Sequence, residues 1–164
     1  MFAYHNETTG LVNASADRVF AHLDDHARLS THMTKSSWTM GGGRMEISSD
    51  AGRGQLVGSH IRLGGRVFGV QLFVEEEVLV HEPPTRKEWE TIGAPRLLVI
   101  GAYRMGFTLA PAADGCQLRV SIDYDVPEQG LSRLLGRMFS GYYARWCTRR
   151  MVLDASDHFA LAAA

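Results

Sequence analysis

Residues 130–159, GLSRLLGRMFSGYYARWCTRRMVLDASDHF, decide the fold of this chain. Apolar side chains recur in this stretch at steps of three and four residues, which is the spacing of one face of an α-helix. They are Leu131, Leu134, Leu135, Met138, Phe139, Tyr142, Trp146 and Leu153. We therefore expect one long amphipathic helix that buries this face. Its rings with polar tips suit the wall of a ligand cavity as well as they suit a plain core.

The chain ahead of this helix has the pattern of β-strands. Strand-like runs, separated by turns that contain glycine or proline, cover residues 2–12, 37–47, 55–63, 66–80, 86–92, 97–109 and 116–126. Alternation of apolar and polar residues is clearest in the last run, which indicates a half-buried antiparallel strand. Two short helices are expected after the first strand, one with Ser15 as its N-cap and one over residues 26–33.

This order of elements leaves few topologies. Strands joined by short turns pair antiparallel, and the terminal helix must bury its apolar face against the concave side of the sheet. With 164 residues the chain is long enough to bury a sizeable core, and we expect a single domain over residues 1–164. A curved sheet cannot close perfectly on a helix, so we expect a pocket between them.

Three segments carry a family resemblance. They are residues 13–20, NASADRVF, residues 78–89 with the Pro83-Pro84 turn ahead of Trp89, and the long closing helix. In this order they resemble the START-like superfamily, also called SRPBCC, which includes polyketide cyclases and dehydrases and lipid-transfer domains. The resemblance implies an α+β helix-grip fold, in which a curved antiparallel seven-stranded sheet surrounds a long C-terminal helix, with two short helices after the first strand. It also implies a deep, mostly apolar cavity but no particular reaction, because the fold hosts binding proteins and enzymes alike.

The charge balance argues against nucleic acid as a partner. Seventeen basic and eighteen acidic residues give a formal charge of −1, so no global field attracts an anionic polymer or lipid surface. The local exception is an arginine stripe on the helix, formed by Arg133, Arg137, Arg145 and Arg149. A solvated face is the simplest interpretation of this stripe, and docking onto acidic lipid or a partner is the alternative.

The chain shows no sign of secretion or of membrane anchoring. Its first residues lack the basic start and apolar run of a secretory signal. The longest apolar run, residues 97–103, is far too short to span a bilayer. We expect a cytoplasmic protein without stable membrane insertion.

The sequence contains no metal or cofactor signature. His22 and His26 lie four residues apart, but a metal site needs a third ligand, and His32 is only loosely placed to supply it. Cys116 and Cys147 lack metal-type spacing, and we expect both to be reduced. Motifs for phosphate binding, dinucleotide binding and activated nucleophiles do not occur. We therefore expect no metal and no cofactor.

The candidate ligand site follows from side chains that share a strand face. In the strand over residues 66–80, Glu76 falls in the apolar phase, so its side chain should point into the fold. We predict a site lined by Phe68, Val70, Leu72, Glu76, Tyr103, Met105, Phe107, Met138, Tyr142 and Trp146. Glu76 and Tyr103 are the candidates for acid–base chemistry. The alternatives are a core role for the aromatic residues Tyr103, Tyr142 and Trp146 and, for Glu76, a bulge or strand end that turns it to solvent.

Two functions fit such a site. The first is binding of a hydrophobic small molecule, such as a lipid, polyketide, isoprenoid or aromatic compound, by a carrier or chaperone. The alternative is an enzyme of the polyketide cyclase or dehydratase type that uses the pocket tyrosine and glutamate as acid and base. A collapsed core without a cavity is a third, purely structural interpretation. The sequence leaves open the ligand, the presence of catalysis and whether the protein forms a homodimer.

Overall fold

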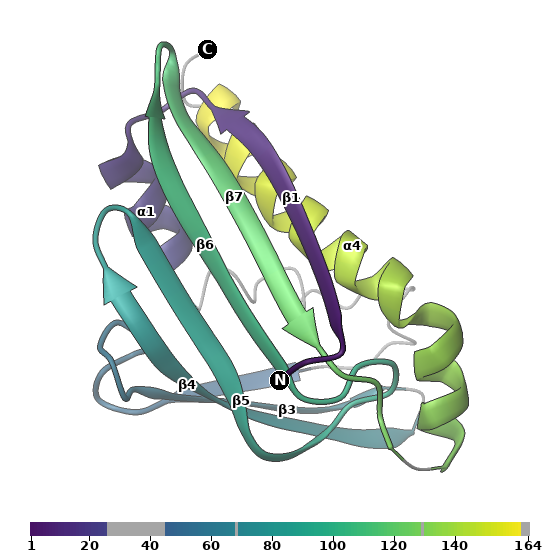
Figure 1. Cartoon of the computed structure of the whole chain (residues 1–164). Helices are drawn as coiled ribbons and strands as arrows, with labels where there is room; N and C mark the ends of the chain where they lie inside the picture. The colour runs from purple at the N-terminus through teal and green to yellow at the C-terminus, as the bar shows by residue number, and fades with distance from the viewer. Residues whose placement is uncertain (26–44, 68, 129, 162–164) are drawn as a thin grey trace.

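A seven-stranded antiparallel sheet and one long helix dominate the computed structural model, which describes residues 1–25, 45–67, 69–128 and 130–161 (Figure 1). The elements are β1 (Tyr4–Val12), α1 (Ala16–Asp24), β2 (Met45–Ser49), β3 (His60–Val67), β4 (Val70–Glu82), β5 (Arg86–Arg96), β6 (Tyr103–Ala112), β7 (Gly115–Tyr124) and α4 (Gly130–Leu161). The strand order is β1-β7-β6-β5-β4-β3-β2, and neighbouring strands are antiparallel. The predicted fold class is confirmed.

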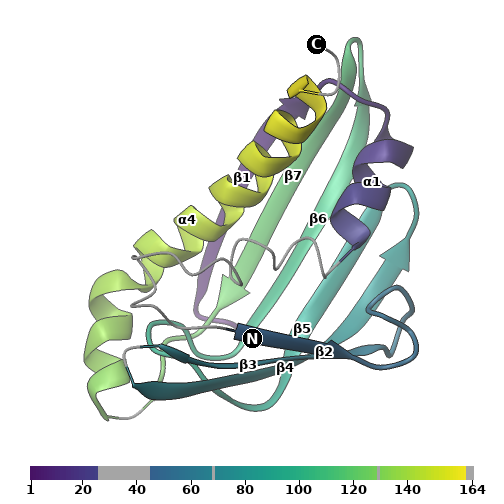
Figure 2. The same cartoon turned by 180° about the vertical axis from the view of Figure 1, so that it is seen from behind.

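The sheet bends strongly and encloses one face. Figures 1 and 2 show β1, β7 and β6 running along α4, while β3 and β4 cross toward the N-terminal end of α4. α1 lies near the opposite end of the molecule, beside β6. The concave face of the sheet is therefore bounded by α4 on one side and by β3 and β4 on the other.

Alternating side chains place one face of each central strand in the core. The buried positions of β7 are Cys116, Leu118, Val120, Ile122 and Tyr124. Those in the middle of β4 are Leu72, Val74, Glu76 and Val78. Glu76 thus lies in the buried phase of its strand, as the alternation predicts.

Some predicted element bounds differ from those observed. β6 begins only at Tyr103, and ahead of it the Gly101 N–H donates to the carbonyl oxygen of Asp125, just after β7, over 2.7 Å. The helix predicted over residues 26–33 and most of the strand predicted over residues 37–47 lie outside the described residues.

α4 packs on the sheet mainly through small side chains. Its buried residues are Gly136, Ser140, Ala144, Thr148, Val152, Ala155 and Phe159. Most of the larger apolar side chains are exposed, namely Leu131, Leu134, Met138, Phe139, Tyr142, Trp146 and Leu153. The prediction that these larger side chains form the buried face is wrong, because the helix rests on another of its sides.

Close approach between α4 and its neighbours explains the preference for small residues. Gly10 of β1 lies directly under α4, and a Cβ atom on Gly10 would overlap the Val152 side chain. Nearer the start of α4, a Cβ atom on Gly136 would lie only 2.7 Å from Pro127 Cδ. Neither glycine position has room for a side chain unless its neighbour is displaced.

Replacing Gly10 with Ala should destabilise the protein, because the added methyl group must displace Val152 or lift α4 away from β1. Overpacking of this kind costs about 1–3 kcal/mol. Val152→Ala removes the opposing atoms, so Gly10→Ala should cost less in a protein that already carries Val152→Ala. Urea unfolding of the four proteins measures this coupling.

Gly64→Ala in β3 is the matched control, because a Cβ atom on Gly64 meets no other atom within 4 Å. It should leave the free energy of unfolding nearly unchanged. Equal losses for Gly10→Ala and Gly64→Ala, without coupling to Val152, would contradict the proposed contact of α4 with β1.

Candidate functional site

A carboxyl group is buried on the concave face of the sheet. Glu76 of β4 is only 4% exposed. The Tyr103 hydroxyl on β6 donates a hydrogen bond to Glu76 Oε1, and the Trp89 side chain on β5 donates a second one to the same carboxyl group. Thr91 of β5 holds Tyr103 in place, since its Oγ1 accepts from the Tyr103 N–H over 3.1 Å. Three adjacent strands thus position two donors around one acceptor.

Burial controls the protonation of Glu76. Loss of solvation raises the pKa of Glu76 to about 7, while the hydrogen bonds from Tyr103 and Trp89 and the charge of Lys87 act in the opposite direction. Burial and the neighbouring Glu76 charge raise the pKa of Tyr103, which keeps its hydroxyl protonated. Near neutral pH, the site therefore combines a carboxyl group that gains and loses a proton with a phenol that remains a donor.

α4 adds a second pair of side chains to the interior. Tyr143 and Cys147, one helical turn apart, are hydrogen-bonded to each other. The nearby Cys147 and burial raise the pKa of Tyr143, and the charge of Glu76 contributes to this rise. Burial raises the pKa of Cys147 to about 12. Both groups stay neutral at physiological pH, so the thiol is not activated as a nucleophile.

The helical pattern favours the wrong tyrosine for this site. Tyr142, predicted to line it, is 73% exposed, whereas Tyr143 packs against buried residues of the sheet. Neighbouring helix residues point about 100° apart, so one step along the sequence moves a side chain from solvent to the interior. Trp89 and Cys147 are also missing from the predicted site. The four-residue spacing of Tyr143 and Cys147, and the alternation along β5, are the signals that point to them.

A second polar cluster joins α1 to the sheet. The fully buried Lys87 places its Nζ 2.5 Å from Asp24 Oδ1, and His81 Nε2 lies 3.0 Å from the same oxygen. Burial lowers the pKa of Lys87, and its contacts with Asp24 oppose this change. Lys87 and Glu76 also influence each other's pKa. The charged groups that influence the pKa of Glu76 therefore extend through Lys87 to Asp24 at the C-terminal end of α1.

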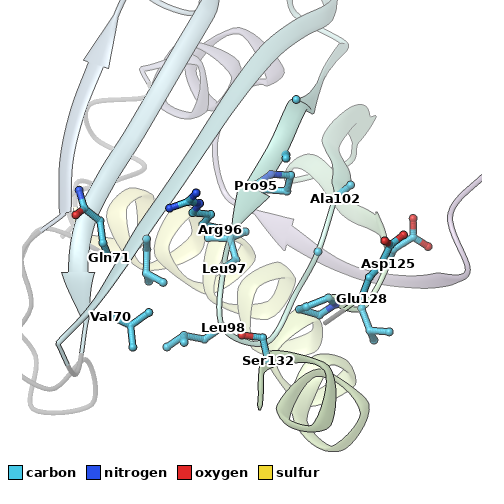
Figure 3. A pocket seen from close by; sticks show the side chains of 16 residues that line it. Val70, Gln71, Pro95, Arg96, Leu97, Leu98, Ala102, Asp125, Glu128 and Ser132 are labelled. Atoms are coloured by element: carbon cyan, nitrogen blue, oxygen red, sulfur yellow. The ribbon is translucent and has the colours of Figure 1, made fainter. Parts of the chain in front are cut away.

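A pocket of about 730 Å³ lies at the N-terminal end of α4 (Figure 3). Its wall comes from the start of β4, the end of β5, the connection from β5 to β6, the segment after β7 and the start of α4. Leu72 in this wall shares the buried face of β4 with Glu76, four residues farther along, or roughly 13 Å at strand spacing. Leu97, also in the wall, packs against the core. The pocket has the size of a small-molecule site.

The predicted site residues fall into separate groups. Those that line the pocket of Figure 3 are Val70 and Leu72. Those that belong to the core cluster or pack against it are Tyr103, Met105 and Phe107. Those exposed on α4 are Met138, Tyr142 and Trp146. Phe68 lies outside the described residues.

Within the described part of the chain, no group of three or more His, Cys, Asp or Glu side chains is arranged to hold a metal ion. His22 stacks on His158, with the ring centroids 4.1 Å apart. His26 and His32 lie outside the described residues. Among the helices that the structure describes, none combines the length and apolar character needed to cross a bilayer.

The curved seven-stranded sheet and the long C-terminal helix define the helix-grip fold of the START-like superfamily. The sequence profile of the family described as polyketide cyclase / dehydrase and lipid transport matches residues 5–152. The chain belongs to this family.

Solved structures show the same fold at low sequence identity. A protein of unknown function, SA2116 from Staphylococcus aureus, matches with a TM-score of 0.61 and 12% identity over 98% of this chain and 94% of that one. Ara h 8.0201 matches with a TM-score of 0.58 and 12% identity over 92% and 98%. A Rhodobacter sphaeroides protein matches with a TM-score of 0.57 and 18% identity over 90% and 89%. These identities support the fold alone. A comparison with curated protein sequences gave no match.

Glu76→Gln should remove a pH dependence of stability. Because the pKa of Glu76 rises from 4.5 to about 7 on folding, the folded protein keeps a proton that the unfolded chain releases between these values. Wild-type stability should therefore fall as the pH rises from about 4.5 to 7, with a Glu76 contribution of roughly 3 kcal/mol. Relative to wild type, the free energy of unfolding of Glu76→Gln, measured with urea, should therefore increase by roughly 3 kcal/mol as the pH rises from about 4.5 to 7.

Glu75→Gln is the matched control. Glu75 lies in the other phase of β4, and hydrogen bonds from Arg62 and His60 lower its pKa. Its ionised form stabilises the fold, so this variant should lose stability relative to wild type as the pH rises through the acid range. A parallel pH dependence for Glu76→Gln and wild type would show that Glu76 titrates as an ordinary carboxyl group.

Proposed function

We propose that this protein binds a hydrophobic small molecule on the concave face of its sheet, and that Glu76 and Tyr103 hold the polar end of that molecule. The buried Glu76, with its hydrogen bond from Tyr103, carries this proposal, because a carboxyl group is costly to bury and adds little to a plain core. The family description, polyketide cyclase / dehydrase and lipid transport, supports the proposed type of ligand, because it names polyketides and lipids. Such molecules are largely apolar and carry a few polar groups.

The two protonation states of Glu76 suit different ligand groups. A protonated carboxyl group donates a hydrogen bond to a carbonyl oxygen, and an ionised one accepts a hydrogen bond from a hydroxyl group. Leu72 and Leu97 in the nearby pocket offer apolar contacts for the remainder of the molecule. A lipid, polyketide, isoprenoid or aromatic compound with one carbonyl or hydroxyl group matches this combination. Binding requires nothing further, so a carrier or chaperone is the simpler form of the proposal.

A cyclase or dehydratase activity is the second candidate, and the pKa of Glu76 favours it. A general base works best when its pKa lies near the working pH, and the pKa of Glu76 is about 7. The ionised carboxylate would take a proton from the carbon next to a ligand carbonyl group. Tyr103 would donate a hydrogen bond to the oxygen that gains negative charge. In a dehydration, Glu76 would return the proton to the departing hydroxyl group, which releases water and leaves a carbon–carbon double bond.

Native mass spectrometry of the purified protein should detect a retained hydrophobic molecule. We expect Glu76→Gln and Tyr103→Phe each to weaken its binding about tenfold, the typical effect of losing one buried hydrogen bond. Glu75→Gln, on the other strand face, should bind like wild type. The absence of a retained molecule, together with no saturable binding of a hydrophobic fluorescent dye, would contradict the proposal.

Product analysis separates a carrier from an enzyme. The protein is incubated with a β-hydroxyketone built on the carbon skeleton of the retained molecule, and loss of water is followed by mass spectrometry. An enzyme should release water, and Glu76→Gln should slow this by about a hundredfold or more. If the wild-type protein leaves the hydroxyketone unchanged, dehydration of this substrate is excluded and the carrier function is the proposal that remains.

A further inference from the structure

The outward side of α4 exposes large apolar side chains. Leu131 is 72% exposed, Met138 66% and Tyr142 73%, and Trp146 and Leu153 are exposed as well. Their spacings of four and seven residues place them along one side of the helix, away from the buried small residues. From Leu131 to Leu153 this outward stripe extends roughly 33 Å at the rise of an α-helix. A surface of this size is more than a scatter of single exposed residues.

The same part of α4 is strongly basic. Between Gly130 and Leu153 the sequence contains five arginines and no aspartate or glutamate. They are Arg133, Arg137, Arg145, Arg149 and Arg150, and all are exposed. Arg150 pairs with Asp154 over 3.1 Å, whereas the described residues include no ion pair for the other four. With a formal charge of −1 for the whole chain, this helix is a local concentration of positive charge.

Basic and apolar side chains alternate on the outward stripe. Arg145 follows Tyr142 by three residues, and Arg149 follows Trp146 by three, so each cation lies beside an aromatic ring on the helix surface. Arginine next to exposed tryptophan, tyrosine and aliphatic side chains is the composition of a helix that lies in a membrane interface. Tyrosine and tryptophan rings prefer the headgroup level of a bilayer.

We propose that the outward stripe of α4 docks the protein onto an anionic lipid surface. The helix lies parallel to the bilayer, Arg145 and Arg149 bind headgroup phosphates, and Met138, Tyr142 and Trp146 enter the boundary between headgroups and acyl chains. This contact is peripheral and reversible.

A second copy of the chain fits the stripe less well. In a twofold symmetric dimer the same surface faces itself, so the arginines of both copies would meet across the interface. The stripe from Gly130 to Leu153 offers no acidic side chain to neutralise them. Like charges across an interface oppose association. An anionic bilayer instead supplies both the negative charge and the apolar layer that the stripe requires.

Sedimentation with vesicles tests this docking. We expect the full-length protein to bind vesicles of phosphatidylcholine mixed with phosphatidylglycerol, and to bind pure phosphatidylcholine vesicles much more weakly. Raising the salt from about 0.1 M to 0.5 M should weaken binding, because salt screens the arginines from the headgroups. Each basic residue near an anionic surface contributes about a fivefold increase in affinity, so the double variant Arg145→Gln/Arg149→Gln should bind at least tenfold more weakly.

Two further variants complete the test. Arg66→Gln/Arg119→Gln removes the same charge from exposed positions on the sheet and should bind like wild type. Met138→Ser should weaken vesicle binding at both salt concentrations, with an unchanged circular dichroism spectrum. Equal loss for the two arginine pairs, or no binding to anionic vesicles, would overturn the proposal. So would a concentration-dependent dimer in light scattering that Met138→Ser abolishes, since a second copy would then cover the stripe.

Discussion

Close packing of α4 on β1 is the constraint on which the rest of the structure depends. Gly10 leaves room for Val152, and the buried Thr148 hydroxyl fixes the helix through hydrogen bonds of 2.8 Å with both Thr8 Oγ1 and Asn6 Nδ2. A helix that rests on small side chains cannot fill the concave face of the sheet with its large ones. The interior is therefore formed mainly by side chains of the sheet, and most of the bulky α4 residues turn outward.

This packing separates two chemically different regions on either side of α4. In the interior, between α4 and the sheet, burial raises the pKa of Glu76, while the donors Tyr103 and Trp89 favour its ionised form. Without these donors, burial alone would favour the neutral form still more strongly. Because burial outweighs these donors, Glu76 lowers the stability of the fold at neutral pH. Such a cost is typical of a group that serves ligand recognition or proton transfer. On the outside, arginines and exposed apolar side chains form a separate surface.

Local spacing accounts for what the sequence predicts correctly. Most of the strands, the long helix and the inward phase of Glu76 follow from apolar periodicity within single elements, and the antiparallel pairing of consecutive strands follows from the short turns between them. The buried side of α4 does not, because the large apolar residues from Leu131 to Leu153 satisfy the same periodicity that a buried face would. The deciding feature, Gly10 under Val152, joins opposite ends of the chain. The alternation along β5 places Trp89 on the inward face, but only the register that pairs Glu76 with Thr91 shows that Trp89 reaches this carboxyl group.

The central claim is that a buried carboxyl group titrating near neutrality forms the polar focus of the ligand site. Nuclear magnetic resonance of protein labelled with ¹³C at the glutamate side-chain carboxyl groups tests it most directly, with the Glu76 signal assigned by its loss in Glu76→Gln. We predict a titration midpoint of about 7 for Glu76, and a higher midpoint in Tyr103→Phe because a donor to the ionised form is lost. A midpoint near 4.5 that Tyr103→Phe leaves unchanged would contradict the claim.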